Sequence, residues 1–97
     1  MSTLTIEHKT ARAKHIVINE DTLTVDLDDG RSVSAPIVWF PRLTHASAKE
    51  RNNWRLIGDG EGIHWEDIDE DISIDNLLFG KTSGENQRSF KKWLAGR

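Results

Sequence analysis

The residues best suited to chemistry in this sequence gather in one stretch, residues 58–79. This stretch holds eight acidic residues, no basic residue and one histidine, His64. Such a set could bind a metal ion, exchange protons with a substrate, imitate a phosphate backbone or form the solvated face of a sheet. The spacing of the residues helps to decide between these four interpretations.

A calcium loop is the first interpretation to compare with the spacing. Oxygen-bearing side chains stand at every second position, as in an EF-hand loop: Asp67, Asp69, Asp71, Ser73 and Asp75. Such a loop needs glycine at its sixth position and a bidentate glutamate at its twelfth. Ile72 and Leu78 stand there instead, and alternation of aspartate with isoleucine is also typical of a half-buried strand. We therefore expect no calcium site.

A transition-metal site would have to use His64 with Asp67 or Asp69. One histidine with mobile carboxylates is a weak ligand set, and the other three histidines stand at no ligand spacing to it. The letters GIHW instead predict a strand with His64 and Trp65 on opposite faces, one of them in the core. No metal and no cofactor are expected.

Acid–base catalysis would use the crowded carboxylates of residues 66–71, because neighbouring carboxylates raise one another's proton affinity. A catalytic pair also needs a cleft, and a chain of 97 residues folded as a thin sheet offers little concave volume. The letters GDGEG (residues 58–62) lack the Lys-Ser/Thr ending and the long following helix of a phosphate loop. We expect a solvated acidic face, no catalytic residue and no enzyme activity.

An acidic face of this kind suits a protein partner, because charge steers association and exposed tryptophans anchor interfaces. The predicted partner-binding residues are Trp39, Asp59, Glu61, Trp65, Glu66, Asp67 and Glu70. The predicted partner is a protein, such as a nucleic-acid enzyme whose basic groove the carboxylates occupy as phosphate mimics. A homodimer formed through a strand edge stays open as an alternative.

Two arginines offer an internal use for part of the acidic charge. Arg42 and Arg51 can each form forked hydrogen bonds to a carboxylate. With Asp69 and Asp71 as those carboxylates, the two arginines would clamp the helical region of the chain onto the acidic strand. Some of the acidic residues would then be structural counter-charges.

The C-terminal residues 83–95 predict an amphipathic helix capped by Ser83, with Phe90, Trp93 and Leu94 on one face. Residues 80–97 hold five basic residues against one acidic residue. A basic helix of this size makes weak, salt-sensitive contact with nucleic acid. Nucleic acid is therefore expected as a weak partner at most.

The hydrophobic periodicity predicts the elements that must position these residues. Residues 22–28 (TLTVDLD) alternate strictly, with Leu23, Val25 and Leu27 on one face. Residues 15–19 (HIVIN) precede them, and residues 31–37 (RSVSAPI) follow a DDG turn, so the three segments predict an antiparallel meander. Residues 1–12 show no clear period and are expected to form a loose arm or an edge strand.

The second half of the chain predicts a hairpin and short helices. Ser47 and Glu50 fit a capping box that starts a helix over residues 48–54. The glycines of residues 55–65 predict a tight β-hairpin, and Ser73 can cap a helical turn that stops at Gly80. The predicted fold is a single α+β domain with an antiparallel β-meander sheet, a further β-hairpin and two to three short helices.

The composition agrees with one globular domain. The 97 residues are 36% hydrophobic and include four tryptophans, which is enough for one core. Cysteine is absent, which excludes disulfides, thiolate chemistry and cysteine-based zinc sites. The first residues lack the pattern of a signal peptide, and no apolar run approaches the ~20 residues of a membrane span. A cytoplasmic location with no membrane contact is expected.

Four motifs carry a resemblance to a known family. They are DGR (29–31), WFPRL (39–43), A-S-x-x-E-R-x-x-W (46–54) and IGDGEGIHWEDIDEDISIDNLLFG (57–80). They resemble the bacterial domain-of-unknown-function family 2442, over about residues 13–80. In that family the domain occurs alone or joined to a helix-turn-helix segment, and its genes often neighbour small proteins suspected to be toxins. The resemblance implies an antitoxin-like or regulatory partner domain, with a toxin-like protein as its partner. The residues after Gly80 are too few for a helix-turn-helix unit, so direct operator binding is not expected.

Overall fold

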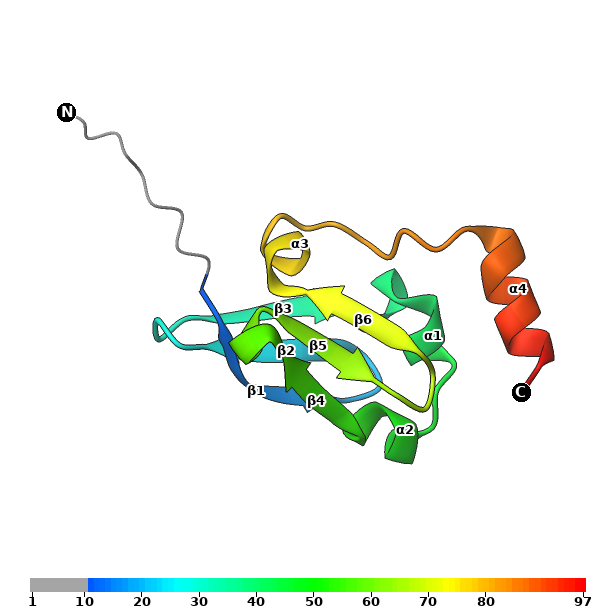
Figure 1. Cartoon of the computed structure of the whole chain (residues 1–97), viewed down its shortest axis with the longest axis horizontal. Coiled ribbons are helices and arrows are strands. Elements are labelled where there is room, and N and C mark those ends of the chain that lie inside the picture. The colour runs from blue at the N-terminus through cyan, green and yellow to red at the C-terminus, as the bar shows by residue number, and fades with distance from the viewer. Residues whose placement is uncertain (1–10) are drawn as a thin grey trace.

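The computed structural model of this protein describes residues 11–97. Figure 1 shows two layers of sheet, one lying over the other, with short helices around their ends. Each layer is a three-stranded antiparallel sheet, in the orders β1-β2-β3 and β4-β5-β6. The predicted α+β class is confirmed. Most of the predicted loose arm, residues 1–10, lies outside the described residues.

The first sheet follows the predicted alternation. Its strands are β1 (Ala13–Ile18), β2 (Thr22–Leu27) and β3 (Ser32–Pro36), paired in an antiparallel meander. Leu23, Val25 and Leu27 all face the core and are buried. The turn between β2 and β3 includes Gly30, whose φ of 92° is a backbone conformation that favours glycine. The predicted meander is confirmed.

Helical turns connect the two sheets. The chain forms the 3-10 turn η1 (Ile37–Trp39), then α1 (Pro41–Thr44) and α2 (Ala48–Asn52). The predicted capping box starts α2: Ser47 Oγ accepts from the backbone N–H of Glu50 at 3.1 Å, and Glu50 Oε1 accepts from the N–H of Ser47 at 2.8 Å. The helix is shorter than predicted, because Trp54 pairs with Trp65 in the second sheet.

The second sheet has one strand more than the predicted hairpin. β4 (Trp54–Ile57) and β5 (Gly62–Trp65) form the expected antiparallel pair, and β6 (Glu70–Ser73) pairs with the other side of β5. β6 has only four residues, of which Ile72 alone is fully buried. Ile72 pairs with Ile63 of β5, so the alternation of aspartate with isoleucine predicts a strand here but not the sheet that it joins.

The two sheets approach each other closely at Gly60, in the 3-10 turn η2 (Gly58–Gly60) between β4 and β5. Gly60 has a φ of 92°, and a Cβ atom there would lie 2.6 Å from the carbonyl oxygen of Ala13 in β1. That distance is too short for a carbon atom against a backbone oxygen. Glycine is therefore required both by the backbone conformation and by the packing.

One hydrophobic core fills the space between the layers. Leu23 from β2 and Ile63 and Trp65 from β5 are completely buried. Each such side chain stabilises the fold by roughly 1.5–3 kcal/mol through its removal from water. The indole N–H of Trp65 donates to the carbonyl oxygen of Arg51 at 2.9 Å, which avoids the cost of a buried donor without a partner.

The helical turn predicted after the acidic strand is α3 (Ile74–Leu78). It begins as predicted, with the hydroxyl of Ser73 accepting from the N–H of Asn76 at 3.0 Å. Gly80 follows the helix with a φ of 75°, which again favours glycine.

An extended segment, residues 81–85, leads from α3 to the last helix, α4 (Gln87–Ala95). α4 begins later than predicted: its cap is Asn86, whose Oδ1 accepts from the N–H of Ser89 at 2.7 Å. The predicted cap Ser83 instead donates its backbone N–H to the carbonyl oxygen of Trp39 at 3.0 Å, which holds the segment on η1. Within residues 11–97, every helix is too short to cross a bilayer.

Candidate functional site

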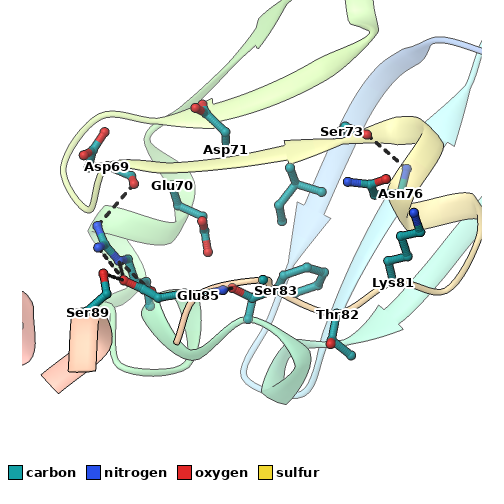
Figure 2. Close-up of a pocket in the computed structure, with 14 residues that line it drawn as sticks. Asp69, Glu70, Asp71, Ser73, Asn76, Lys81, Thr82, Ser83, Glu85 and Ser89 are labelled. Carbon is teal, nitrogen blue, oxygen red and sulfur yellow. Dashed lines mark hydrogen bonds and ion pairs between the residues drawn. The ribbon is translucent and has the colours of Figure 1, made fainter. Parts of the chain in front are cut away.

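A groove lies between β6 and the 81–85 segment, with a volume of about 350 Å³. Residues 69–73 form one wall and residues 81–85 the other, while Phe40 and Ile72 supply apolar surface. Figure 2 shows the side chain of Glu70 pointing from β6 into this groove. The acidic strand thus borders a concave site, which a thin sheet was not expected to offer.

Glu70 is the most perturbed ionisable group of the groove. Its atom Oε2 is buried and has no hydrogen-bond partner among the described residues. Burial raises the pKa of Glu70 from its ordinary value of 4.5 to about 7. The backbone amide of Asp71 and the charge of Arg42 act in the opposite direction and only partly offset the burial.

Arg42 from α1 and Glu85 from the opposite wall form a forked ion pair at one end of the groove. Nη2 of Arg42 lies 2.6 Å from Oε2 of Glu85, and Nε lies 2.9 Å from Oε1. Both side chains are largely buried, with 14% and 12% exposed. The pair holds the pKa of the Glu85 carboxyl below its ordinary value and raises the pKa of Arg42.

The prediction that Arg42 binds the carboxylate of Asp69 or Asp71 is wrong. Nη1 of Arg42 donates to the backbone carbonyl oxygens of Ile68 and Asp69, at 2.9 and 3.3 Å. The turn before β6 presents these carbonyls to α1, whereas Asp69 and Asp71 are exposed residues. Arg42 does fasten the helical region to the acidic strand, but through the strand's backbone.

Arg51 also differs from its predicted role. Its Nε and Nη2 donate to the carbonyl oxygens of Leu43 and Thr44, both at 2.9 Å. These carbonyls belong to the end of α1, where a helix leaves acceptors without internal partners. Arg51 therefore caps α1 and does not bind Asp69 or Asp71.

The two tryptophans predicted to bind a partner lie in different environments. The prediction that Trp65 contacts a partner is wrong, because its side chain is completely buried between the sheets. Trp39 is half-buried and packs against the core, and its carbonyl oxygen receives the N–H of Ser83. The sequence placed His64 and Trp65 on opposite faces of the strand, and the packing puts Trp65 in the core.

The four remaining predicted carboxylates lie on the surface beside polar neighbours. Arg12 lies 3.7 Å from Asp59 and 3.8 Å from Glu61. Glu66 pairs with Arg55 at 2.9 Å, and Asp67 accepts from the side-chain amide of Asn53 at 2.9 Å. Two cations, Arg12 and Arg55, thus lie beside three of these four carboxylates, and Asp67 meets a neutral amide.

His64 uses its Nδ1 to hydrogen-bond the carboxylate of Asp71, its cross-strand neighbour. The partner of His64 is thus a carboxylate of the neighbouring strand β6. Among residues 11–97, no three histidine, aspartate or glutamate side chains gather closely enough to hold a metal ion.

The C-terminal helix docks on the α1–α2 side of the domain through aromatic and cationic side chains. The indole of Trp93 lies 5.1 Å from the guanidinium carbon of Arg42 and 4.6 Å from that of Arg97. Arg97 also pairs with Glu50, and Phe90 contacts His45 with ring centroids 5.2 Å apart. The basic residues Arg88, Lys91 and Lys92 stay exposed.

Sequence reasoning missed the second wall of the groove. Glu85, Ser83 and Lys81 all line it, yet they lie outside the acidic stretch that drew attention. One signal was available, because Glu85 is the single acidic residue after Gly80. A lone acid in a basic tail suggests a specific cationic partner.

The fold and groove define a two-sheet α+β domain with an acidic edge site. The chain belongs to the family described as protein of unknown function (DUF2442), whose model matches residues 13–83. No curated protein matches it. α4 lies beyond the matched residues, whereas both sheets and the helices α1, α2 and α3 lie within them.

Two solved structures share this fold. A protein of unknown function from Rhodospirillum rubrum is 26% identical, with a TM-score of 0.70 over 79% of this chain and 95% of its own. An uncharacterised protein from Chromobacterium violaceum, determined by solution NMR, is 18% identical, with a TM-score of 0.65 over 88% of this chain and 74% of its own. Each supports the two-sheet architecture.

Proposed function

We propose that this protein is a non-enzymatic cytoplasmic domain that binds a protein partner in an antitoxin-like or regulatory role. The observation that carries this proposal is the exposure of Phe79, whose side chain is 78% exposed at the end of α3. Large exposed aromatic side chains are typical anchors of protein interfaces. Phe79 lies between Asn76 and Lys81 in the chain, and both of these residues line the acidic groove.

The surroundings of Phe79 favour a partner with a basic surface. Asp75 stands four residues before Phe79, and the N–H of Phe79 donates to its carbonyl oxygen at 3.0 Å, so the two side chains share one face of α3. The groove beside them carries the carboxylates of Asp69, Glu70 and Asp71. Burial of the Phe79 ring would stabilise a complex, and the surrounding carboxylates would attract a basic partner surface.

Phosphate mimicry of a nucleic-acid enzyme's substrate is a narrower form of the same proposal. The local pairing of Asp59, Glu61 and Glu66 with Arg12 and Arg55 counts against it, because a mimic needs uncompensated charge. Binding of nucleic acid itself is a separate candidate, favoured by the exposed Arg88, Lys91 and Lys92 on α4. Such contact would weaken steeply as salt rises.

The test is affinity capture from cells that express the protein natively, with the wild type and Phe79→Ala as baits. We expect one stoichiometric partner, retained by the wild type and reduced at least tenfold by Phe79→Ala. Val17→Ala is the matched control, because Val17 is also an exposed apolar residue, at 53%, but lies on β1. The proposal would be rejected if no partner were recovered at low salt, or if the wild type and Phe79→Ala recovered equal amounts of it.

Two further measurements separate the rival partners. A mobility shift with nucleic acid that disappears with rising salt would favour the nucleic-acid candidate. A dimer in size-exclusion chromatography that Phe79→Ala converts to a monomer would identify a second copy of this chain as the partner.

A further inference from the structure

The groove between β6 and the 81–85 segment combines a cavity with an excess of negative charge. Four carboxylates and two cations line it: Asp69, Glu70, Asp71 and Glu85 against Arg42 and Lys81. Arg42 is already bound by Glu85 at 2.6 Å, and no ion pair joins Lys81 to Glu70 among the described residues. The carboxylate that points into the groove therefore lacks a cationic partner.

We infer that this groove receives a lysine side chain of the partner protein, whose ammonium group binds Glu70. The inference rests on the proposed function and names the chemistry by which the partner is recognised. The buried Oε2 of Glu70 has no hydrogen-bond donor within residues 11–97. A donor brought by a partner would bind the other carboxylate oxygen, which is not buried in this way, and would balance the surplus charge.

Lysine fits this site better than arginine. Oε2 of Glu70 is buried, so a donor from outside meets one oxygen, whereas a guanidinium group binds best when it can fork to both oxygens of a carboxylate. An ammonium group is compact and carries three donors, and the polar residues Thr82 and Ser83 also line the groove. Phe40 and Ile72 offer apolar surface for the four-carbon stem.

The ionisable groups that face Glu70 come from three sides. Arg42 lies on α1, Asp69 and Asp71 flank Glu70 in the chain, and Lys81 and Glu85 lie on the opposite wall. Only the ionised carboxylate attracts an ammonium group. With a pKa of about 7 for Glu70, affinity for the lysine is expected to rise about tenfold between about pH 6 and pH 8.

The experiment is an NMR titration of the full chain with N-acetyl-lysine N-methylamide as the probe. We expect saturable shifts of the backbone amides of residues 69–73 and 81–85, stronger at the higher pH. Glu70→Gln keeps the shape of the side chain and should weaken binding at least fivefold. Glu20→Gln is the matched control, because it makes the same change at an exposed residue between β1 and β2, outside the groove lining, and should leave binding unchanged.

Two probes of similar size complete the design. The blocked norleucine compound has a similar stem without the charge and should not shift these amides. Equal shifts with norleucine, undiminished binding by Glu70→Gln, or no saturable shift up to about 100 mM probe would overturn the inference. Tighter binding of the blocked arginine compound would overturn the choice of lysine.

The failure of this inference can be told apart from the failure of the proposed function. A captured partner that depends on Phe79 and binds Glu70→Gln as well as the wild type would reject the lysine contact and keep the partner-binding role. Absence of any captured partner would reject that role, whatever the probe does.

Discussion

The guanidinium of Arg42 and the carboxylate of Glu85 meet at 2.6 Å and join two segments 43 residues apart. The same guanidinium reaches the carbonyl oxygen of Ile68 and lies over the ring of Trp93. One side chain thus connects α1, the turn before β6, the 81–85 segment and α4.

Replacement of Arg42 by alanine should destabilise the protein by about 2 kcal/mol, because it strips a largely buried carboxylate of its charge-assisted hydrogen bonds. The measurement is urea unfolding followed by tryptophan fluorescence. Arg31→Ala is the control, since the Arg31–Asp29 pair is exposed and should matter little. Equal unfolding midpoints for wild type and Arg42→Ala would contradict the assigned role.

Glu70→Gln should flatten the pH dependence of stability. The folded protein holds the Glu70 proton more tightly than the unfolded chain does, with a pKa of about 7 against 4.5. The resulting stabilisation is complete below about pH 4.5 and is lost as the pH rises through about 7. Because the side chain is only partly buried, we expect a loss of about 1–2 kcal/mol in the wild type. Unfolding curves of both proteins at several pH values measure it, and parallel pH profiles would refute it.

Gly60→Ala should destabilise the contact between the two sheets. The added Cβ atom would meet the carbonyl oxygen of Ala13 at 2.6 Å, on a backbone with φ of 92°. We expect a loss of about 2–4 kcal/mol, measured by thermal unfolding. Gly84→Ala is a suitable control, because its Cβ would meet nothing within 4 Å. A similar melting temperature for the two variants would show that η2 can move away from β1.

Trp93→Ala should release α4 without unfolding the sheets. Trp93 contacts the guanidinium groups of Arg42 and Arg97 and stacks with Phe90, and each cation–π contact contributes about 0.5–1 kcal/mol at an exposed site. Amide hydrogen exchange should accelerate over residues 87–95 and stay slow in β2 and β5. Leu94→Ala, at a 39% exposed position of the same helix, is the control. Faster exchange throughout the chain would mean that α4 is integral to the fold.

The strands and caps with local signals could be predicted from the sequence. Leu23, Val25 and Leu27 alternate because successive side chains of a strand point to opposite faces. Ser47 and Glu50 bind each other's backbone within one helical turn. Both the strand alternation and the capping box depend on residues close together in the chain, so they can be predicted without knowledge of the rest of the fold.

The groove could not be predicted in the same way. Its walls come from residues 69–73 and 81–85, and its end is closed by Arg42 from α1. The sequence analysis predicted Asp69 or Asp71 as the partner of Arg42, but in the folded protein Arg42 pairs with Glu85. Long side chains take the acceptors that the tertiary fold brings within hydrogen-bond distance.

The amino-acid order by itself determined the family, the α+β class, the antiparallel meander, the main helix cap and the concentration of acid in residues 58–79. Only the tertiary structure decided that β6 completes a second sheet, that Trp65 is buried and His64 faces Asp71, and that a buried oxygen of Glu70 has no partner within residues 11–97. The physical reason is that propensity and periodicity act within a few residues, whereas burial and ion pairing depend on segments that meet only when the chain is folded.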